Sequence, residues 1–211
     1  MTYELFGYWR SSASWRVRIA LGLKGLEYTN TPVNLLENEQ GSDAHAARNP
    51  MKQLPVLVTP DGPLTQSLAI VDWLDRAHPE PALYPASSGD RARALALAEI
   101  VNAGIQPLQN LKVLLKLQAQ GVDRAAWGRE AIQDGLEAFQ ALARTTTAGF
   151  SVGDTVTVAD LCLVPQLYNA RRFDCDLSRL SLLTDIEARC ADLPAFQAAH
   201  PDNQPDARRT P

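Results

Sequence analysis

Three serines stand close together where an extended segment gives way to a helical one, in the run YWRSSASWR from Tyr8 to Arg16. A helix N-terminus presents free backbone amides and the positive end of the helix dipole, so it stabilises an anion placed there. With a serine hydroxyl as a further donor, such a turn would lower the pKa of a thiol beside it. Because position 13 is Ala13 and the run holds no cysteine, a cofactor must bring any thiolate that acts here. The alternative is that Ser11 and its neighbours only cap the helix.

Two later places could hold a peptide-like ligand. A cis bond between Leu54 and Pro55 would turn the Leu54 backbone outward, although only about 5% of X-Pro bonds are cis. Gln66 and Ser67 open a helix and therefore offer donors for a carboxylate, unless they serve only as its cap.

An alternation of extended and helical segments positions these residues in the first part of the chain. The predicted elements are a strand over 3–9, a helix over 11–24, a strand over 26–35, a polar stretch over 37–49 with a short helix, a hairpin of 54–58 and 62–65, and a helix that Ser67 caps and that stops near Pro79. Pro32 places the second strand at a sheet edge, because proline cannot donate to a ladder. A strand, a helix and a strand in succession imply a parallel pair, to which the hairpin adds antiparallel strands.

The remainder of the chain has a helical pattern. Residues 79–89 are dense in proline, serine and glycine and predict a linker between domains. The helices expected after it run from Asp90 to Ile105 with a break at Pro107, over 111–117, over 124–144, and from a capping box at Thr157 and Asp160 to near Arg171. The sequence therefore predicts an α/β domain of residues 1–83 followed by an all-α domain of residues 84–211.

Composition excludes several classes of function. The chain has 211 residues, with 20 Lys and Arg against 24 Asp and Glu and a net charge of −4, which argues against nucleic-acid binding. Its three cysteines have no CxxC spacing and its three histidines are scattered, so we expect no disulfide framework and no metal site. No apolar run reaches the roughly 18–20 residues of a membrane span, and the first residues lack a signal sequence. We therefore expect a cytoplasmic protein without membrane contact.

Six segments carry a more specific pattern. They are the SSAS opening of the first helix, NPMKQLPVL (49–57), QSLAIVDWL (66–74), GIQPLQNLKVL (104–114), DLCLVPQLYNARRF (160–173) and HPDNQPD (200–206). Together they resemble the zeta class of glutathione transferases, which includes maleylacetoacetate and maleylpyruvate isomerases. The resemblance covers nearly the whole chain. It implies a thioredoxin-like, glutathione-binding domain at 1–83, an all-helical, substrate-binding domain at 84–211, glutathione held between them, and a homodimer.

The resemblance also implies roles for individual residues. Ser11, the first serine of the motif, would donate a hydrogen bond to the glutathione sulfur, with Ser12 in the same motif. The positions implied to hold glutathione are Ser11, Ser12, Ala13, Arg16, Gln40, Gln53, Leu54, Pro55, Gln66, Ser67, Gln106 and Asn110. Leu54 would pair its backbone with the cysteinyl part, and Gln66 and Ser67 would hold the γ-glutamyl carboxylate.

The reaction that the resemblance implies is a cis–trans isomerisation in the catabolism of aromatic compounds. The glutathione thiolate adds to the double bond of maleylacetoacetate (tyrosine degradation) or maleylpyruvate (gentisate degradation), the bond rotates, and elimination gives the fumaryl isomer. Because this substrate is a dianion, arginines should grip it. Arg10 is the first candidate and Arg172 the second, and both join Ser11 and Ser12 as expected catalytic residues. Arg171 either binds the substrate as well or faces solvent. The alternative for both Arg171 and Arg172 is that they are only cations at a helix C-terminus, where they stabilise the helix dipole.

Three functions stay open at this point. They are the isomerase, a glutathione S-transferase or α-haloacid dehalogenating enzyme on the same site, and a non-catalytic glutathione-binding module. Arg10 and Arg172 favour a substrate with carboxylates, and hence the first two. Most zeta-class members carry cysteine where this chain has Ala13, and that departure keeps the third open. Tyr8 is an alternative source of the hydroxyl, but the SSxS motif favours Ser11.

Overall fold

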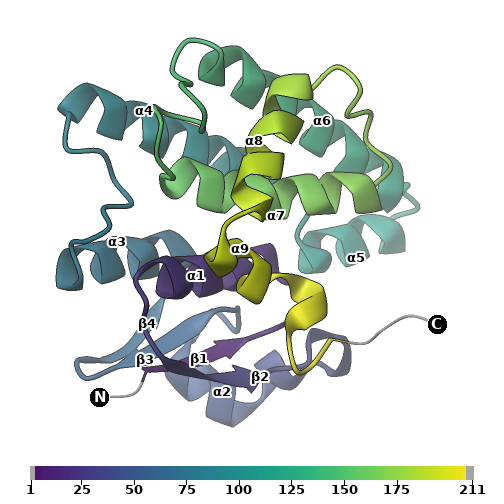
Figure 1. Ribbon diagram of the computed structural model, residues 1–211. Coiled ribbons are helices and arrows are strands. Elements are labelled where there is room, and N and C mark those ends of the chain that lie inside the picture. Colours follow the sequence, from purple (N-terminus) through teal and green to yellow (C-terminus); the bar gives the residue numbers. More distant parts are fainter. Residues whose placement is uncertain (1–2, 208–211) are drawn as a thin grey trace. The chain divides into compact units, whose positions relative to one another are not determined.

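A computed structural model describes residues 3–207. Four strands form one mixed sheet in the order β2-β1-β3-β4 (Figure 1). They are β1 (Tyr3–Gly7), β2 (Tyr28–Pro32), β3 (Val56–Thr59) and β4 (Gly62–Thr65). β1 pairs in parallel with β2 and antiparallel with β3, and β3 pairs antiparallel with β4. The predicted parallel pair and hairpin are confirmed, and Pro32 ends an edge strand as its chemistry requires.

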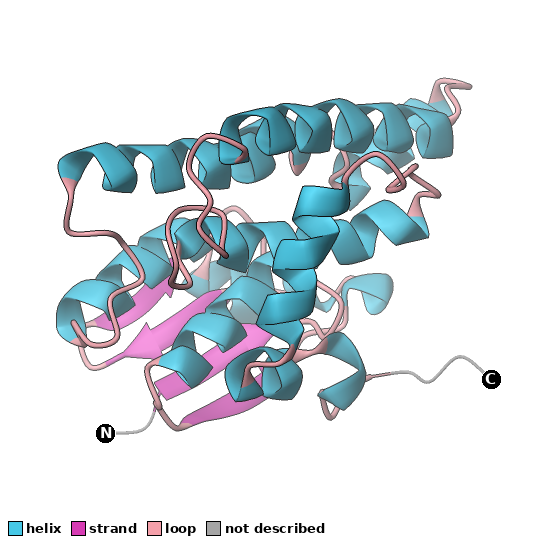
Figure 2. Cartoon of the chain, turned by 45° about the horizontal axis from the view of Figure 1, so that its top comes forward, coloured by secondary structure: helices cyan, strands magenta, loops and turns pink. Residues whose placement is uncertain are grey.

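Helices cover both faces of this sheet. α1 (Ser12–Leu23) and α3 (Ser67–Ala77) lie on one side, and α2 (Asp43–Arg48) lies on the other, after the short 3-10 helices η1 (Leu35–Glu37) and η2 (Glu39–Gly41) (Figures 1 and 2). Side chains alternate between the faces of a strand. Leu5 and Leu57, opposite each other on β1 and β3, are fully buried, while Phe6 packs with Val56 on the α2 side, where the Arg48 guanidinium lies 4.2 Å from its ring centroid.

The chain divides into two compact units, and the division differs from the expected domains at one end. The first unit runs to Ala82 and also includes the chain from Asp192 onward, and the second is Leu83–Ala191. The prediction of 84–211 had placed the C-terminal segment with the helical part. Instead α9 (Pro194–Ala199) packs on α1. Gly22 permits this close approach because it has no side chain: a Cβ at Gly22 would lie only 3.1 Å from Ala195 Cβ. The roles assigned to the two domains stay predictions.

The second unit is helical. Its elements are α4 (Ser88–Glu99), the π-helical turn η3 (Ile100–Ile105), α5 (Leu111–Ala119), α6 (Arg124–Ala143), α7 (Val158–Arg172) and α8 (Ser181–Ala191). The expected helix from Asp90 to Ile105 is α-helical only as far as Glu99 and continues as the π-helical turn η3, and the predicted break at Pro107 follows. α8 and the short α9 were not predicted. α7 is buried along most of its length.

The predicted capping box opens α7. The Thr157 side chain accepts a backbone hydrogen bond within the first turn, and the Asp160 carboxylate accepts one from Thr157 N–H at 2.8 Å. Asp160 is wholly buried, and its other oxygen accepts from Ser151 N–H at 2.8 Å. Burial raises the pKa of Asp160, and the hydrogen bonds from Ser151 and Thr157 oppose that rise.

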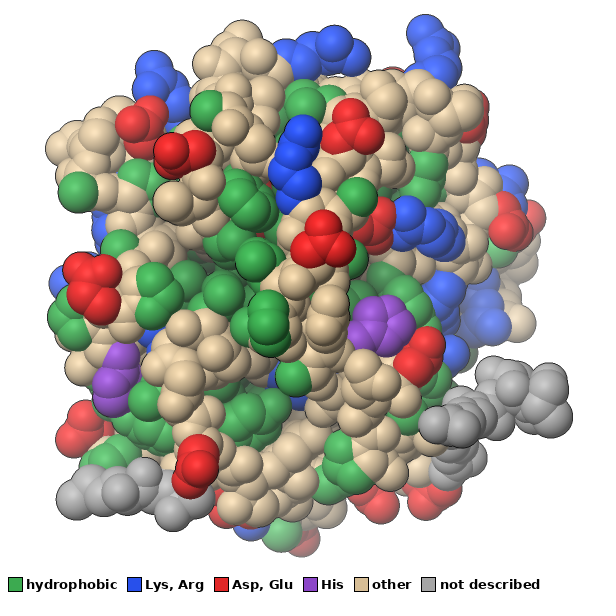
Figure 3. Space-filling view, in the orientation of Figure 1, with side chains coloured by type: hydrophobic (Ala, Val, Ile, Leu, Met, Phe, Trp, Pro, Cys, Tyr) green, Lys and Arg blue, Asp and Glu red, His purple; other side chains and the backbone are tan. Residues whose placement is uncertain are grey.

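Within residues 3–207, no helix combines the length and the hydropathy that a membrane span needs. On the face drawn in Figure 3, the acidic and basic side chains of the described residues are interspersed.

Candidate functional site

Ser11 lies at the junction between β1 and α1 and serves as the helix N-cap. Its Oγ accepts a hydrogen bond from Ser14 N–H at 3.2 Å. The capping alternative is therefore observed, but it does not use the hydroxyl proton, since the oxygen accepts through a lone pair. The side chain is half-buried rather than enclosed. Ser11 can thus cap α1 and donate to an anion at the same time.

The residues that follow Ser11 differ in accessibility. Ser12 and Ala13 form the first turn and are half-buried, so their position suits a ligand at the helix end. Ser14 is fully buried, and its Oγ accepts from Tyr8 N–H at 3.4 Å. A Cβ at Gly7 would lie 3.2 Å from Ser14 Cβ, so the last serine of the motif packs α1 onto the end of β1.

The start of α3 corrects one sequence-based assignment. The N-cap is Gln66, and Ser67 is the first helical residue, so Ser67 does not cap the helix. The Ser67 hydroxyl instead accepts from Nη1 of the fully buried Arg16 at 3.2 Å. That bond joins α1 to α3, and it shows Arg16 supporting Ser67 from inside the fold. The first-turn amides of α3 face outward from a helix end, where they can bind a carboxylate.

Gln66 has an unusual backbone conformation. Its φ of 65° and ψ of 108° fall where residues with a Cβ are rarely found. Such conformations persist where the surrounding fold imposes them, and they cluster at ligand sites. Its side chain is exposed at the helix end. The fold therefore imposes this conformation on Gln66, and its contact with a ligand stays a prediction.

The cis peptide bond between Leu54 and Pro55 is confirmed. Two side chains from α2 and the turn after it fix the carbonyl of Gln53, the residue before Leu54. His45 Nε2 lies 3.0 Å from Gln53 O, and Asn49 Nδ2 lies 2.8 Å from it. No hydrogen bond from another described residue reaches the Leu54 backbone. Its N–H and C=O are thus available to a ligand, and the pairing with a peptide-like ligand stays a prediction.

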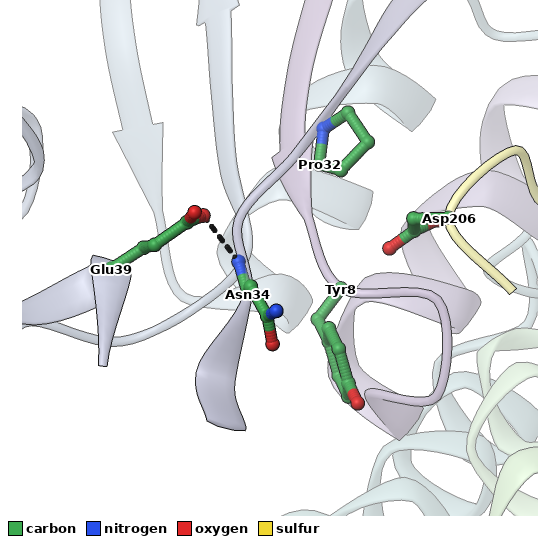
Figure 4. A pocket seen from close by; sticks show the side chains of 5 residues that line it. All are labelled: Tyr8, Pro32, Asn34, Glu39 and Asp206. Carbon is green, nitrogen blue, oxygen red and sulfur yellow. Dashed lines mark hydrogen bonds between the residues drawn. The ribbon is translucent and has the colours of Figure 1, made fainter. Parts of the chain in front are cut away.

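A pocket of about 240 Å³ lies beside the end of β1 (Figure 4). Its lining residues are Tyr8, Pro32, Asn34, Glu39 and Asp206. Glu39 Oε2 accepts from Asn34 N–H at 2.6 Å, which fixes the loop after β2. Next to it, Gln40 Nε2 donates to Asn38 Oδ1 at 2.9 Å, and its buried Oε1 has no hydrogen-bond partner among the described residues.

Arg10 provides positive charge at this end of the first unit. It is half-buried, and its guanidinium lies 5.1 Å from the Trp9 ring centroid. Among the described residues, no carboxylate forms an ion pair with Arg10. A guanidinium held by stacking and not by an acid keeps the N–H donors at the edge of its plane for a ligand.

The predicted residues of the second unit fall into two groups. Gln106 Nε2 lies 3.5 Å from Oε1 of the buried Gln166, and Asn110 is the exposed N-cap of α5. Arg171 donates to both oxygens of Glu187, at 2.7 and 2.5 Å, and these bonds raise the pKa of Arg171. Arg172 is exposed, and its Nη1 donates to the neutral Asn169 at 2.8 Å.

The chain is similar in sequence and structure to known proteins. Residues 1–76 match the family model for the glutathione S-transferase N-terminal domain. The maleylacetoacetate isomerase of Rhizobium meliloti is 47% identical over 94% of this chain and 95% of that protein. The structure of a bacterial zeta-class glutathione S-transferase, maleylpyruvate isomerase, is 41% identical over 97% of this chain and 100% of its own, with a TM-score of 0.94.

The chain belongs to the zeta class of glutathione transferases. A further relative of this class, maleylacetoacetate isomerase from Anaeromyxobacter dehalogenans, has been solved with glutathione in its active site. It is 51% identical, covers 98% of both chains and has a TM-score of 0.91. The same relative was also solved with dicarboxyethyl glutathione and citrate.

This zeta-class chain also contains supporting residues that sequence reasoning missed. Arg18 and Asp206 both bind the backbone at the end of β1, and neither was assigned a role. The QPD tail was recognised as a motif, which was the one available signal for Asp206. Arg18 stands two residues after Arg16 inside a helix, and nothing in that spacing distinguishes a buried arginine from an exposed one.

Proposed function

We propose that this protein is a glutathione-dependent cis–trans isomerase that converts a maleyl dicarboxylate, maleylacetoacetate or maleylpyruvate, to its fumaryl isomer. The observation that carries the proposal is Arg10, a cation without an acidic partner among the described residues, one position from the hydroxyl of Ser11 at the α1 N-terminus. This arrangement offers donors for a thiolate and a guanidinium for a carboxylate side by side. The similar proteins from Rhizobium meliloti and from the bacterial zeta class are named for this isomerisation.

The first unit fits glutathione at three points. The Leu54 backbone is available for the peptide part, the α3 N-terminus at Gln66 and Ser67 suits a carboxylate, and the α1 N-terminus at Ser11 suits a thiolate. Bound glutathione would supply the thiolate that adds to the cis double bond and leaves after rotation. Ser11 would hold the proton of its hydroxyl toward the sulfur, which lowers the thiol pKa.

The arginines account for the substrate class. Arg10 would bind one carboxylate of the substrate in a bidentate manner, and we propose Arg172 for the second. Positive groups near the reacting carbons also stabilise the negative charge that develops on the substrate when a thiolate adds. Arg171 is left out of this proposal, because Glu187 occupies its donor face.

The test follows the ultraviolet absorbance of maleylpyruvate and of maleylacetone, an analogue of maleylacetoacetate, with and without catalytic glutathione. We expect conversion to the fumaryl product that requires glutathione and consumes none. Ser11→Ala and Arg10→Ala should weaken it strongly, and Arg171→Ala is the matched control that should not. A protein that binds glutathione but converts neither substrate would refute the isomerase and redirect the search to haloacids and electrophilic aryl compounds.

We further propose that the enzyme works as a cytoplasmic homodimer in tyrosine or gentisate breakdown. The resemblance to the zeta class supports the dimer, and exposed apolar side chains such as Met51 and Leu36 supply surface that an interface would cover. Light scattering of the purified protein measures its mass directly. The substrate preferred in the absorbance assay assigns the pathway.

A further inference from the structure

The backbone of Trp9, just after β1, is held by one side chain from α1 and one from the C-terminal segment. Trp9 N–H donates to Asp206 Oδ2 at 2.9 Å, across 197 positions of sequence. Trp9 C=O accepts from Arg18 Nη2 at 2.8 Å. Both backbone polar groups of the residue before Arg10 are therefore fixed by charged side chains.

Arg18 extends this arrangement. It is almost fully buried, its Nε donates to Ala199 O at 3.1 Å and its Nη1 to Tyr8 O at 3.5 Å. Burial lowers the pKa of Arg18 to about 10, an effect that Tyr28 and Asp206 oppose. The guanidinium stays charged at neutral pH, with Asp206 as a nearby negative group. Arg18 and Asp206 thus join the C-terminal segment to the turn that leads into the SSxS motif.

The two residues after Trp9, Arg10 and Ser11, carry the proposed chemistry. The Arg10 guanidinium stacks on the Trp9 ring at 5.1 Å, and Ser11 N–H donates to Tyr8 O at 3.0 Å. A shift of the Trp9 backbone would therefore move the guanidinium and the serine together. Displacements of about 1 Å at a reacting group cost on the order of a hundredfold in rate.

We propose that Asp206 is a positioning residue for the isomerisation: its carboxylate fixes the Trp9 backbone and thereby the places of Arg10 and Ser11. This inference rests on the proposed function of that site. Asp206 is not assigned a contact with glutathione or with the dicarboxylate. It acts only through the backbone that carries the two side chains.

The C-terminal segment provides a matched control. Asn30 Nδ2 on β2 donates to Gln204 Oε1 at 3.2 Å, so this bond ties the same segment to the sheet without touching Trp9. If Asp206 merely held the segment down, Asn30→Ala and Asp206→Ala would have the same consequences. If Asp206 positions the turn, only Asp206→Ala should disturb the chemistry.

The experiment compares Asp206→Ala, Asp206→Asn and Asn30→Ala with wild type in two assays. The first titrates the thiol of bound glutathione by its thiolate absorbance and needs no substrate. The second measures kcat and KM for maleylpyruvate. We expect Asp206→Ala to raise the bound thiol pKa and to lower kcat/KM about tenfold or more, since a hydrogen bond to a charged group is lost. Asp206→Asn keeps an oxygen acceptor for Trp9 N–H and should restore most of both, while Asn30→Ala should lower stability alone.

Asp206→Ala with an unchanged thiol pKa and unchanged kcat/KM per folded molecule would overturn the proposal, as would equal effects of Asp206→Ala and Asn30→Ala. If Asp206→Ala does not fold, Asp206→Glu keeps the charge but moves the acceptor by one methylene. It should then raise the thiol pKa, and a wild-type value would also overturn the proposal. A wild type that binds glutathione without isomerising anything would defeat the proposed function, yet the thiol titration would still decide the role of Asp206.

Discussion

Replacing Gln66 by glycine should make the protein more stable while weakening its hold on glutathione. The backbone at φ 65° and ψ 108° costs a residue with a Cβ on the order of 1–3 kcal/mol. Glycine relieves only the part of that cost that comes from the Cβ, because this ψ lies outside both the left-handed helical and the mirror-β regions that glycine favours. Glycine also gives the unfolded chain more freedom, which offsets about 0.4–1 kcal/mol of the gain. Because the Gln66 side chain is exposed, little packing is lost. The free energy of unfolding should therefore rise by at most about 1 kcal/mol, and Tm by at most about 2–4 °C for a chain of this size.

The assay is urea and thermal unfolding of the ligand-free protein, with glutathione affinity measured by calorimetry. Gln66→Ala is the matched control, because it removes the amide but keeps the Cβ and the backbone cost. Both variants remove the side-chain amide that we propose binds the γ-glutamyl carboxylate, so both should bind glutathione about tenfold more weakly. Only Gln66→Gly should gain stability.

Two results would refute this reasoning separately. A Gln66→Gly protein no more stable than Gln66→Ala would show that the Cβ of residue 66 adds no cost to this backbone conformation. A Gln66→Ala protein that binds glutathione as tightly as wild type would remove the side chain from the binding site and leave the backbone argument intact.

Four further substitutions have definite expected outcomes. Ser11→Ala should lower the free energy of unfolding, measured in urea, by about 1 kcal/mol because the helix cap is lost. It should also raise the pKa of the bound glutathione thiol. If Ser11 served only as a cap, the stability would change and the thiol pKa would not. Arg171→Ala breaks a partly exposed pair with Glu187, so it should change stability by less than about 1 kcal/mol and leave KM unchanged, while Arg172→Ala should raise KM for the dicarboxylate in the same steady-state assay. Asp160→Asn leaves one of two buried amides without its acceptor and should cost about 2 kcal/mol. Burial raises the pKa of Asp160 in the folded state. The stability that its protonation contributes is therefore complete below the pKa of the unfolded chain, and it declines as the pH rises through the pKa of the folded state. Asp160→Asn should remove this dependence and flatten the free energy of unfolding from about pH 4 upward.

Features contained within a few residues could be predicted from the sequence. The capping box needs only Thr157 and Asp160 on one turn, and both of its bonds are present. Pro32 marked an edge strand because proline lacks the donor that an inner strand must supply. The turn from strand to helix before Ser11 was visible for the same reason, as its cap and its first turn are neighbours in sequence.

Features that join distant segments were not predictable in this way. Ser67 has the residue type and position of a cap, and only the fold shows that its hydroxyl serves Arg16. The packing of α9 on α1 depends on a close approach between Gly22 and Ala195, which no local pattern encodes. Arg171 and Arg172 are adjacent in sequence, and only the fold shows that Arg171 pairs with Glu187 of another helix.

The first unit is completed by both ends of the described chain, and this sets an order for its assembly during synthesis. A ribosome releases β1 and α1 first, but the acceptor for Trp9 N–H is made 197 residues later. The helical segment Leu83–Ala191 emerges entirely in the interval and has its own core to fold around. The turn that bears Arg10 and Ser11 therefore waits longest for its final contacts. A chain cut off before Asp192 should keep the helical unit and lose the finished turn, so an incomplete product would carry the serines without the framework that places them.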